Sequence, residues 1–185
     1  DSNIAYDATE FINESIWEVG KTLLEAGLIV IVVIFLFLGN LRSTFIPVVT
    51  IPLSLVGVAL VLVAFGYSIN LLTLLALVLC IGLVVDDAIV VVENIQRRVD
   101  LGEPPLVAAK RGTEQVAFAV LATTAVLVAV FLPVAFLGGV TGTLYQQFAI
   151  TIAISVVVSW IIALTLSPAL AAIIIFAALR PDPRD

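Results

Sequence analysis

The sequence predicts an all-α protein, a polytopic bundle with five membrane-spanning helices. Hydrophobic residues make up 62% of the 185 residues and charged residues only 12%, whereas soluble domains are about 45–50% apolar and about 25% charged. Five apolar stretches approach or exceed the ~20 residues that a helix needs to cross a bilayer core about 30 Å thick. None of the stretches alternates as the strands of a membrane β-barrel do.

The apolar stretches define the predicted domain organisation. A transmembrane bundle covers residues 20–179, and residues 180–185 form a short cytoplasmic tail. The last span is longer than a bilayer requires and contains Pro168, which should bend the helix or let it tilt. The predicted spans are residues 20–38, 45–65, 70–92, 116–137 and 149–179.

The segment before the first span differs in character from the rest of the chain. Asp7 and Glu10 have the spacing of a helix capping box. Apolar residues then recur on one helix face, at Ile12, Ile16, Val19 and Leu23. We therefore predict one helix from about Ala8 to Leu38, whose amphipathic, acidic start within residues 1–19 stands outside the membrane. An irregular tail before the span is the alternative.

A short helix is also predicted between the third and fourth spans. Pro104 and Pro105 precede Leu106, Val107 and two alanines, and proline is common at the first position of a helix. We expect this helix to lie along the cytoplasmic surface, and a solvated linker is the alternative.

The distribution of lysine and arginine predicts the orientation of the chain. Cytoplasmic loops of membrane proteins carry an excess of these residues. Only Lys21 falls on the opposite side, which places the N-terminal segment in the periplasm and the C-terminus in the cytoplasm. The seven basic residues that share one side are Arg42, Arg97, Arg98, Lys110, Arg111, Arg180 and Arg184.

Composition excludes several classes of function. The chain has no His, so histidine catalysis and histidine metal sites are ruled out, and its single Cys80 offers no disulfide framework. The net charge of −6 has the wrong sign for a nucleic-acid surface. Composition thus argues against a metal site and a nucleic-acid partner, and the bilayer is the expected surrounding. We also expect no bound cofactor and no enzyme activity.

Asp86 and Asp87 are the two residues that such a sequence accommodates at greatest cost. Apolar residues flank the pair on both sides, and a carboxylate at mid-bilayer costs at least about 2.5–3.5 kcal/mol. Asp86 precedes Arg97 by eleven residues, or ~16 Å along a helix, which is too deep for a short side chain to reach the interface. Since burial disfavours the charged form, a carboxyl here can take up and release a proton. Capping of a helix end is the alternative.

Neighbouring residues could support this pair. Gly82 lies one turn before Asp86 and could admit water or a close neighbour, and Glu93 and Asn94 lie one to two turns beyond Asp87. These three are predicted to support helix packing or the relay. The hydroxyl groups within the spans are expected mostly to make contacts between helices: Thr123, Thr124, Ser155, Ser159 and Thr165.

The run from Gly82 to Asn94 closely resembles the fourth transmembrane helix of resistance–nodulation–division (RND) efflux pumps of the hydrophobe/amphiphile multidrug branch. The segments Phe37–Arg42 and Phe65–Asn70 resemble two of that family's helix turns. Phe136–Gly142 and Leu166–Leu170 resemble its fifth and sixth helices. The resemblance extends over nearly the whole chain, which would correspond to transmembrane helices 2–6 of the N-terminal half of the inner-membrane permease.

The resemblance implies a proton-driven antiporter that exports drugs and contributes to antibiotic resistance. The family's pump is a homotrimer of the bacterial inner membrane, with a second homologous half, a periplasmic adaptor and an outer-membrane channel as partners. Protons are its coupling ion, and the acids that carry them match Asp86 and Asp87. A lysine on the second half faces these acids in the family, so this chain would hold half of the relay and be inactive alone.

Other functions stay open at this point. A heavy-metal or lipid exporter of the same superfamily is possible, although one Cys and no Met argue against soft-metal ligands. An intramembrane aspartyl protease needs two carboxyls that face each other, whereas here both lie on one helix.

Overall fold

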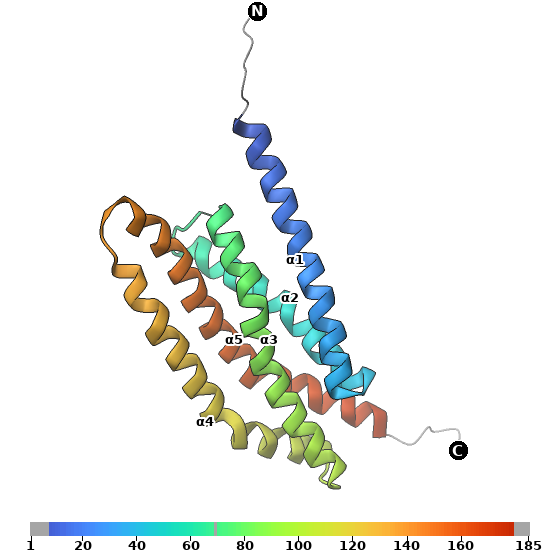
Figure 1. The fold of residues 1–185 in the computed structure, drawn as a ribbon. Coiled ribbons are helices and arrows are strands. Elements are labelled where there is room, and N and C mark those ends of the chain that lie inside the picture. Colours follow the sequence, from blue (N-terminus) through green and yellow to red (C-terminus); the bar gives the residue numbers. More distant parts are fainter. Residues whose placement is uncertain (1–7, 69, 180–185) are drawn as a thin grey trace, which may run out of the picture.

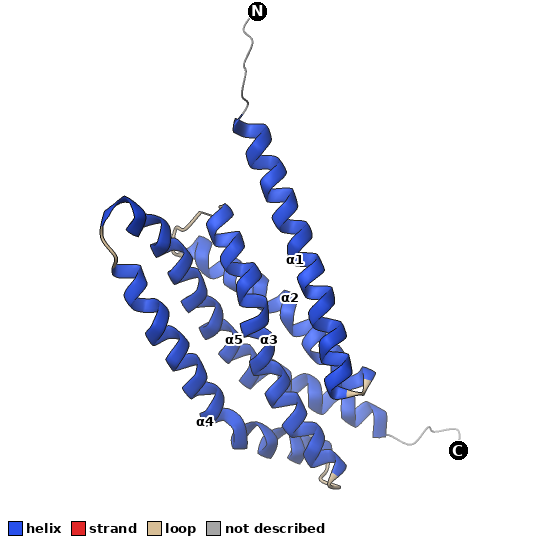
Figure 2. Cartoon of the chain, viewed as in Figure 1, coloured by secondary structure: helices blue, strands red, loops and turns tan. Residues whose placement is uncertain are grey.

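The computed structural model describes residues 8–68 and 70–179, which form helices joined by short loops and contain no strand (Figures 1 and 2). All five α-helices are long and apolar enough to cross a membrane, which confirms the predicted all-α bundle. The elements are α1 (Ala8–Leu38), α2 (Leu41–Ala64), α3 (Leu71–Asp100), α4 (Pro105–Phe131), the 3-10 helix η1 (Leu132–Phe136) and α5 (Gly139–Leu179).

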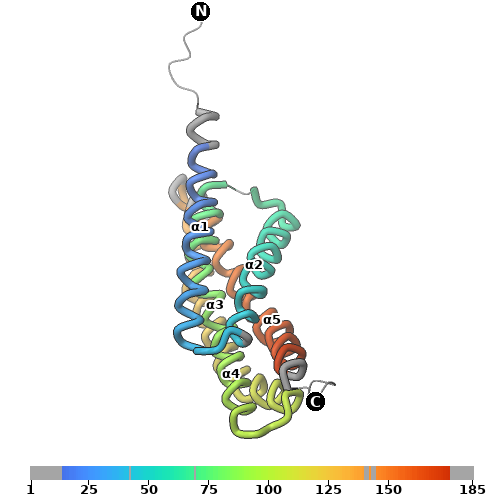
Figure 3. The backbone as a smooth tube through the Cα atoms, turned by 90° about the vertical axis from the view of Figure 1, so that its right-hand side faces the viewer, coloured from blue at the N-terminus to red at the C-terminus, as the bar shows by residue number. Residues whose placement is uncertain are grey.

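Helix α1 has the predicted bounds and is continuous. Its first turns extend beyond the ends of α3 and α5, as Figures 1 and 3 show from two sides. In this part Val19 is buried whereas Trp17 is 79% exposed, so one face packs and the other does not. Asp7 of the predicted capping box and the predicted tail at 180–185 lie outside the described residues.

Helix α3 begins where the sequence predicted and ends later. The side chain of Asn70 caps the first turn by accepting hydrogen bonds from the backbone N–H groups of Leu72 and Thr73. The helix continues past residue 92 to Asp100 because a polar sequence ends a span without ending a helix. Gly102, with φ of 91°, then lets the chain turn toward α4.

The predicted surface helix is present as the first turns of α4 and is continuous with the fourth span. It begins at Pro105 with Pro104 as its N-cap. Figure 1 shows these turns lying across the end of the bundle before α4 rises along α5. No turn or loop separates the two parts, since Thr113 to Phe118 continue the helical hydrogen bonding.

Helix α5 starts ten residues before the predicted span and contains Pro168 within it. Proline lacks the amide hydrogen that would bond one turn back, which permits a bend. Figure 1 shows the C-terminal part of α5 changing direction below the crossing with α3, as the sequence predicted for a helix with an internal proline.

The acid-bearing helix α3 lies at the centre of the bundle and contacts α1, α2, α4 and α5. Small residues allow close approach of neighbouring helices. A Cβ on Gly112 of α4 would lie 3.0 Å from the Ile95 Cα of α3, and one on Gly57 of α2 would lie 3.3 Å from Val158 of α5. Large apolar side chains cover the outer surface, as expected for contact with lipid.

Candidate functional site

Asp86 and Asp87 lie near the middle of α3 and face different neighbours. Asp86 is exposed on the side of α1, and Asp87 is partly buried. The residues that flank them, Val84, Val85 and Ala88, are almost completely buried. Because adjacent helical residues point about 100° apart, one helix presents the two carboxyls to two separate surroundings.

Asp86 borders a groove between α1 and α3 with a volume of about 290 Å³. Val30, Val33 and Ile34 of α1 form one wall, and Gly82 lies in the other. A Cβ built on Gly82 would meet nothing within 4 Å, so the missing side chain leaves open space one turn from Asp86. The structure thus places Gly82 beside the acid, with open space between them and α1.

Asp87 faces α5 through Ser159. The Ser159 hydroxyl donates a hydrogen bond to the backbone oxygen of Val84 at 3.0 Å and lies 3.5 Å from Oδ2 of Asp87. A hydroxyl has a single hydrogen, so the nearer carbonyl is its main acceptor and the carboxylate is a weak second one. Ser159 is 2% exposed, so this contact lies within the helix interface.

Sequence reasoning grouped Ser159 with ordinary packing residues and missed its contact with Asp87. A signal was available in the spacing. Thr151, Ser155 and Ser159 recur every four residues on one face of α5, and all three are buried. The hydroxyl groups of Thr151 and Ser155 donate to their own helix at 2.7 Å, and that of Ser159 bonds across to α3.

Glu93 and Asn94 have different surroundings. Glu93 is exposed. The Asn94 side chain donates to the backbone oxygen of Gly112 at 2.7 Å and to Oε1 of Gln115 at 3.2 Å. Asn94 therefore ties α3 to α4 at the point of their close approach.

A cluster of charged residues strengthens the same junction between α3 and α4. Arg98 donates to Glu103 at 2.7 Å and to Gln115 at 3.1 Å, and Arg111 lies 3.8 Å from Glu103. The side chains of Arg98 and Glu103 are only 21% and 25% exposed. The loop between the helices is thereby fixed at the end of the bundle.

Neither carboxylate of the pair forms an ion pair with another described residue. In the same part of the chain, acidic and cysteine side chains nowhere gather into a group of three that could hold a metal ion. Cys80 is fully buried in the contact between α3 and α5. The chemistry that the described residues offer at this site is proton uptake and release by two carboxyls.

Comparison with known proteins places this arrangement in a family. The model of the AcrB/AcrD/AcrF family matches residues 1–183. An uncharacterized transporter from Haemophilus influenzae is 51% identical over 98% of the chain. Multidrug export protein AcrF of Escherichia coli and toluene efflux pump membrane transporter TtgB of Pseudomonas putida are each 49% identical over 90% of it.

The match covers the chain almost completely but only part of each relative. The aligned residues span 16–18% of the length of these three proteins. The family match extends over all five helices and both acids. The chain therefore belongs to the AcrB/AcrD/AcrF family of RND efflux transporters.

Proposed function

We propose that this chain is a transmembrane half-domain of a proton-driven efflux transporter, in which Asp86 and Asp87 bind and release the transported protons. The observation that carries the proposal is the placement of both carboxyls near the middle of the membrane-length helix α3. One of them borders a groove and the other contacts α5. This arrangement gives one acid an open approach and couples the other to a neighbouring helix.

Protonation of such a pair would change how α3 packs. A charged carboxylate in a medium of low polarity is unfavourable, and proton binding removes that charge. Since α3 contacts each of the other α-helices, a change in its preferred position reaches the whole bundle. The membrane potential supplies about 2.3 kcal/mol per proton for each 100 mV. Protons, as the coupling ion, can therefore drive the transport cycle without a separate cofactor.

The relatives' names support drugs and organic solvents as substrates, since they read multidrug export and toluene efflux. We further propose that the chain acts in a bacterial inner membrane together with a second homologous half, in a homotrimer with a periplasmic adaptor and an outer-membrane channel. Its N-terminal segment would be periplasmic and its C-terminus cytoplasmic, because the basic residues gather at the other end of the bundle.

Substitution of the acids tests this function. Asp86→Asn and Asp87→Asn would be introduced into the full-length transporter that carries these residues and expressed in a strain without other efflux pumps. Asp100→Asn is the matched control, because Asp100 is an exposed acid at the end of the same helix. We expect both relay variants to lose drug resistance at normal membrane levels and the control to retain it. Unimpaired resistance in either relay variant would refute the role of that acid.

A further inference from the structure

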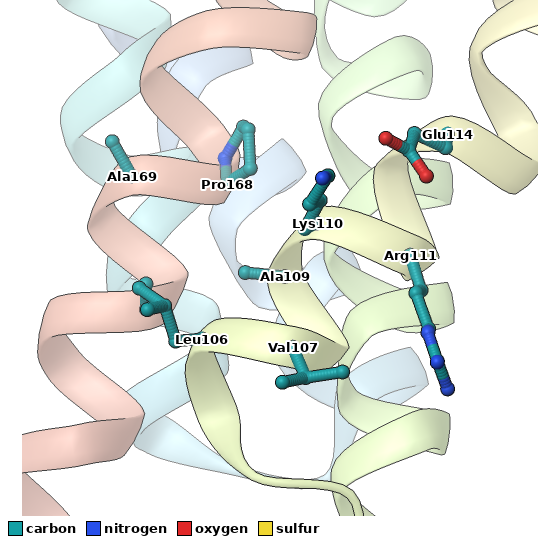
Figure 4. A pocket seen from close by; sticks show the side chains of 9 residues that line it. Leu106, Val107, Ala109, Lys110, Arg111, Glu114, Pro168 and Ala169 are labelled. Atoms are coloured by element: carbon teal, nitrogen blue, oxygen red, sulfur yellow. The ribbon is translucent and has the colours of Figure 1, made fainter.

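A groove separate from the acid pair lies between the first turns of α4 and the proline region of α5. Its volume is about 620 Å³, within the range of small-molecule sites. Leu106 and Ala109 of α4 and Pro168 and Ala169 of α5 form its apolar walls, and Lys110 lies at its edge (Figure 4). The groove thus combines an apolar interior with a cation.

Lys110 is the cation available to a ligand here. In the described part of the chain its ammonium group has no hydrogen bond and no ion pair. Figure 4 shows Lys110 between Pro168 and Glu114, whereas Arg111 points away from α5. Arg111 also lies 3.8 Å from Glu103. Glu114 is the acidic residue of the lining, and Lys110 is the cation that lies between it and Pro168.

The groove lies at the end of the bundle where the membrane surface is expected. Arg97 and Arg98 end α3 at this same end, next to the start of α4. Leu106 lies one turn before Lys110 and is 74% exposed, so the first turns of α4 present apolar and basic groups together. Segments of this kind lie in the interface between headgroups and acyl chains.

We propose that this groove binds an anionic phospholipid. Lys110 would contact the phosphate, and the apolar walls from Leu106 to Ala169 would hold the glycerol and the first methylene groups of the chains. Basic pockets between transmembrane helices on the cytoplasmic side are typical sites for anionic headgroups. The site is distinct from Asp86 and Asp87, and the proposal does not depend on proton transport.

Native mass spectrometry of the full-length transporter, purified in mild detergent, tests the proposal. Phosphatidylglycerol and phosphatidylcholine with identical chains would be titrated onto the protein. We expect wild type to retain phosphatidylglycerol in preference. Lys110→Gln should weaken this binding about fivefold, as loss of one basic contact near a membrane surface predicts, and Lys110→Arg should retain it.

Two further variants separate charge, shape and folding. Arg97→Gln removes one charge at the same end of the bundle outside the groove and should leave lipid binding unchanged. Ala169→Trp should fill the groove without changing its charge, and it should reduce the retention of phosphatidylglycerol. Size-exclusion profiles check that each variant is folded. Equal retention of the two lipids by wild type would overturn the proposal, as would equal effects of Lys110→Gln and Arg97→Gln.

Discussion

The Ser159 hydroxyl of α5 lies 3.5 Å from Oδ2 of Asp87 on α3, and its main acceptor is the Val84 carbonyl of the same helix. A single serine therefore connects one acid of the pair and the backbone beside it to the neighbouring helix. Any shift of α3 relative to α5 must change this contact. We therefore predict that Ser159 helps to position Asp87.

Substitution Ser159→Ala should reduce transport moderately. Hydrogen bonds between transmembrane helices contribute about 0.6 kcal/mol on average, which corresponds to about a threefold change in rate. Ser155→Ala is the matched control, because that hydroxyl lies one turn away on the same face and donates within its own helix. Efflux rates of the Ser159→Ala and Ser155→Ala variants, measured in cells, test this prediction. Equal rates in both variants would contradict the positioning role.

Substitution Gly82→Leu should impair transport while the protein still folds. A leucine side chain would fill the groove of about 290 Å³ that Asp86 borders and keep water from the carboxyl. A clear loss of efflux rate is expected, because the bulky side chain would occupy the open space beside the Asp86 carboxyl. Gly82→Ala should be tolerated, because its Cβ meets nothing within 4 Å.

The control for the groove is Gly20→Leu on α1, where the surroundings of the glycine are also open. It adds the same bulk far from the acid pair. Normal efflux by the Gly82→Leu variant would show that the groove is not the route by which Asp86 exchanges protons.

Substitution Gly112→Ala should destabilise the bundle by about 1–3 kcal/mol. The new methyl group would lie 3.0 Å from both Cα and Cγ1 of Ile95, and relief of that overlap would strain the Asn94 bond to the Gly112 carbonyl. Thermal unfolding in detergent measures the loss. Gly20→Ala, which places its methyl group in open space, should be neutral or slightly stabilising; equal melting of the two variants would contradict the packing argument.

Much of the fold could be predicted because lipid imposes simple rules on sequence. Membrane-length apolar runs can only be helices or barrels, and the bounds of α1 agree with the prediction. The C-terminal end of α3 and the start of α5 could not be predicted in this way, because hydropathy marks the end of a membrane span and not the end of a helix. The polar residues 93–100 continue α3 beyond the apolar run.

The acid pair could be predicted because two carboxylates within an apolar run are costly wherever they point. Its surroundings could not, since sequence spacing gives the angle between Asp86 and Asp87 but not which helix each one faces. The contacts of Ser159 with Asp87 and of Asn94 with Gly112 depend on the packing of α3 against α5 and α4. The four-residue spacing of Thr151, Ser155 and Ser159 marks a polar face of α5, but it does not say which residues of α3 that face contacts.

The most direct test of the central claim is substrate-dependent proton flux through the full-length transporter in liposomes loaded with a pH-sensitive dye. Under an imposed pH gradient, wild type and Asp100→Asn should move protons when an exported drug is added. Asp86→Asn and Asp87→Asn should show no drug-dependent flux. Wild-type flux in either of these two variants would contradict the assignment of that acid as a proton carrier.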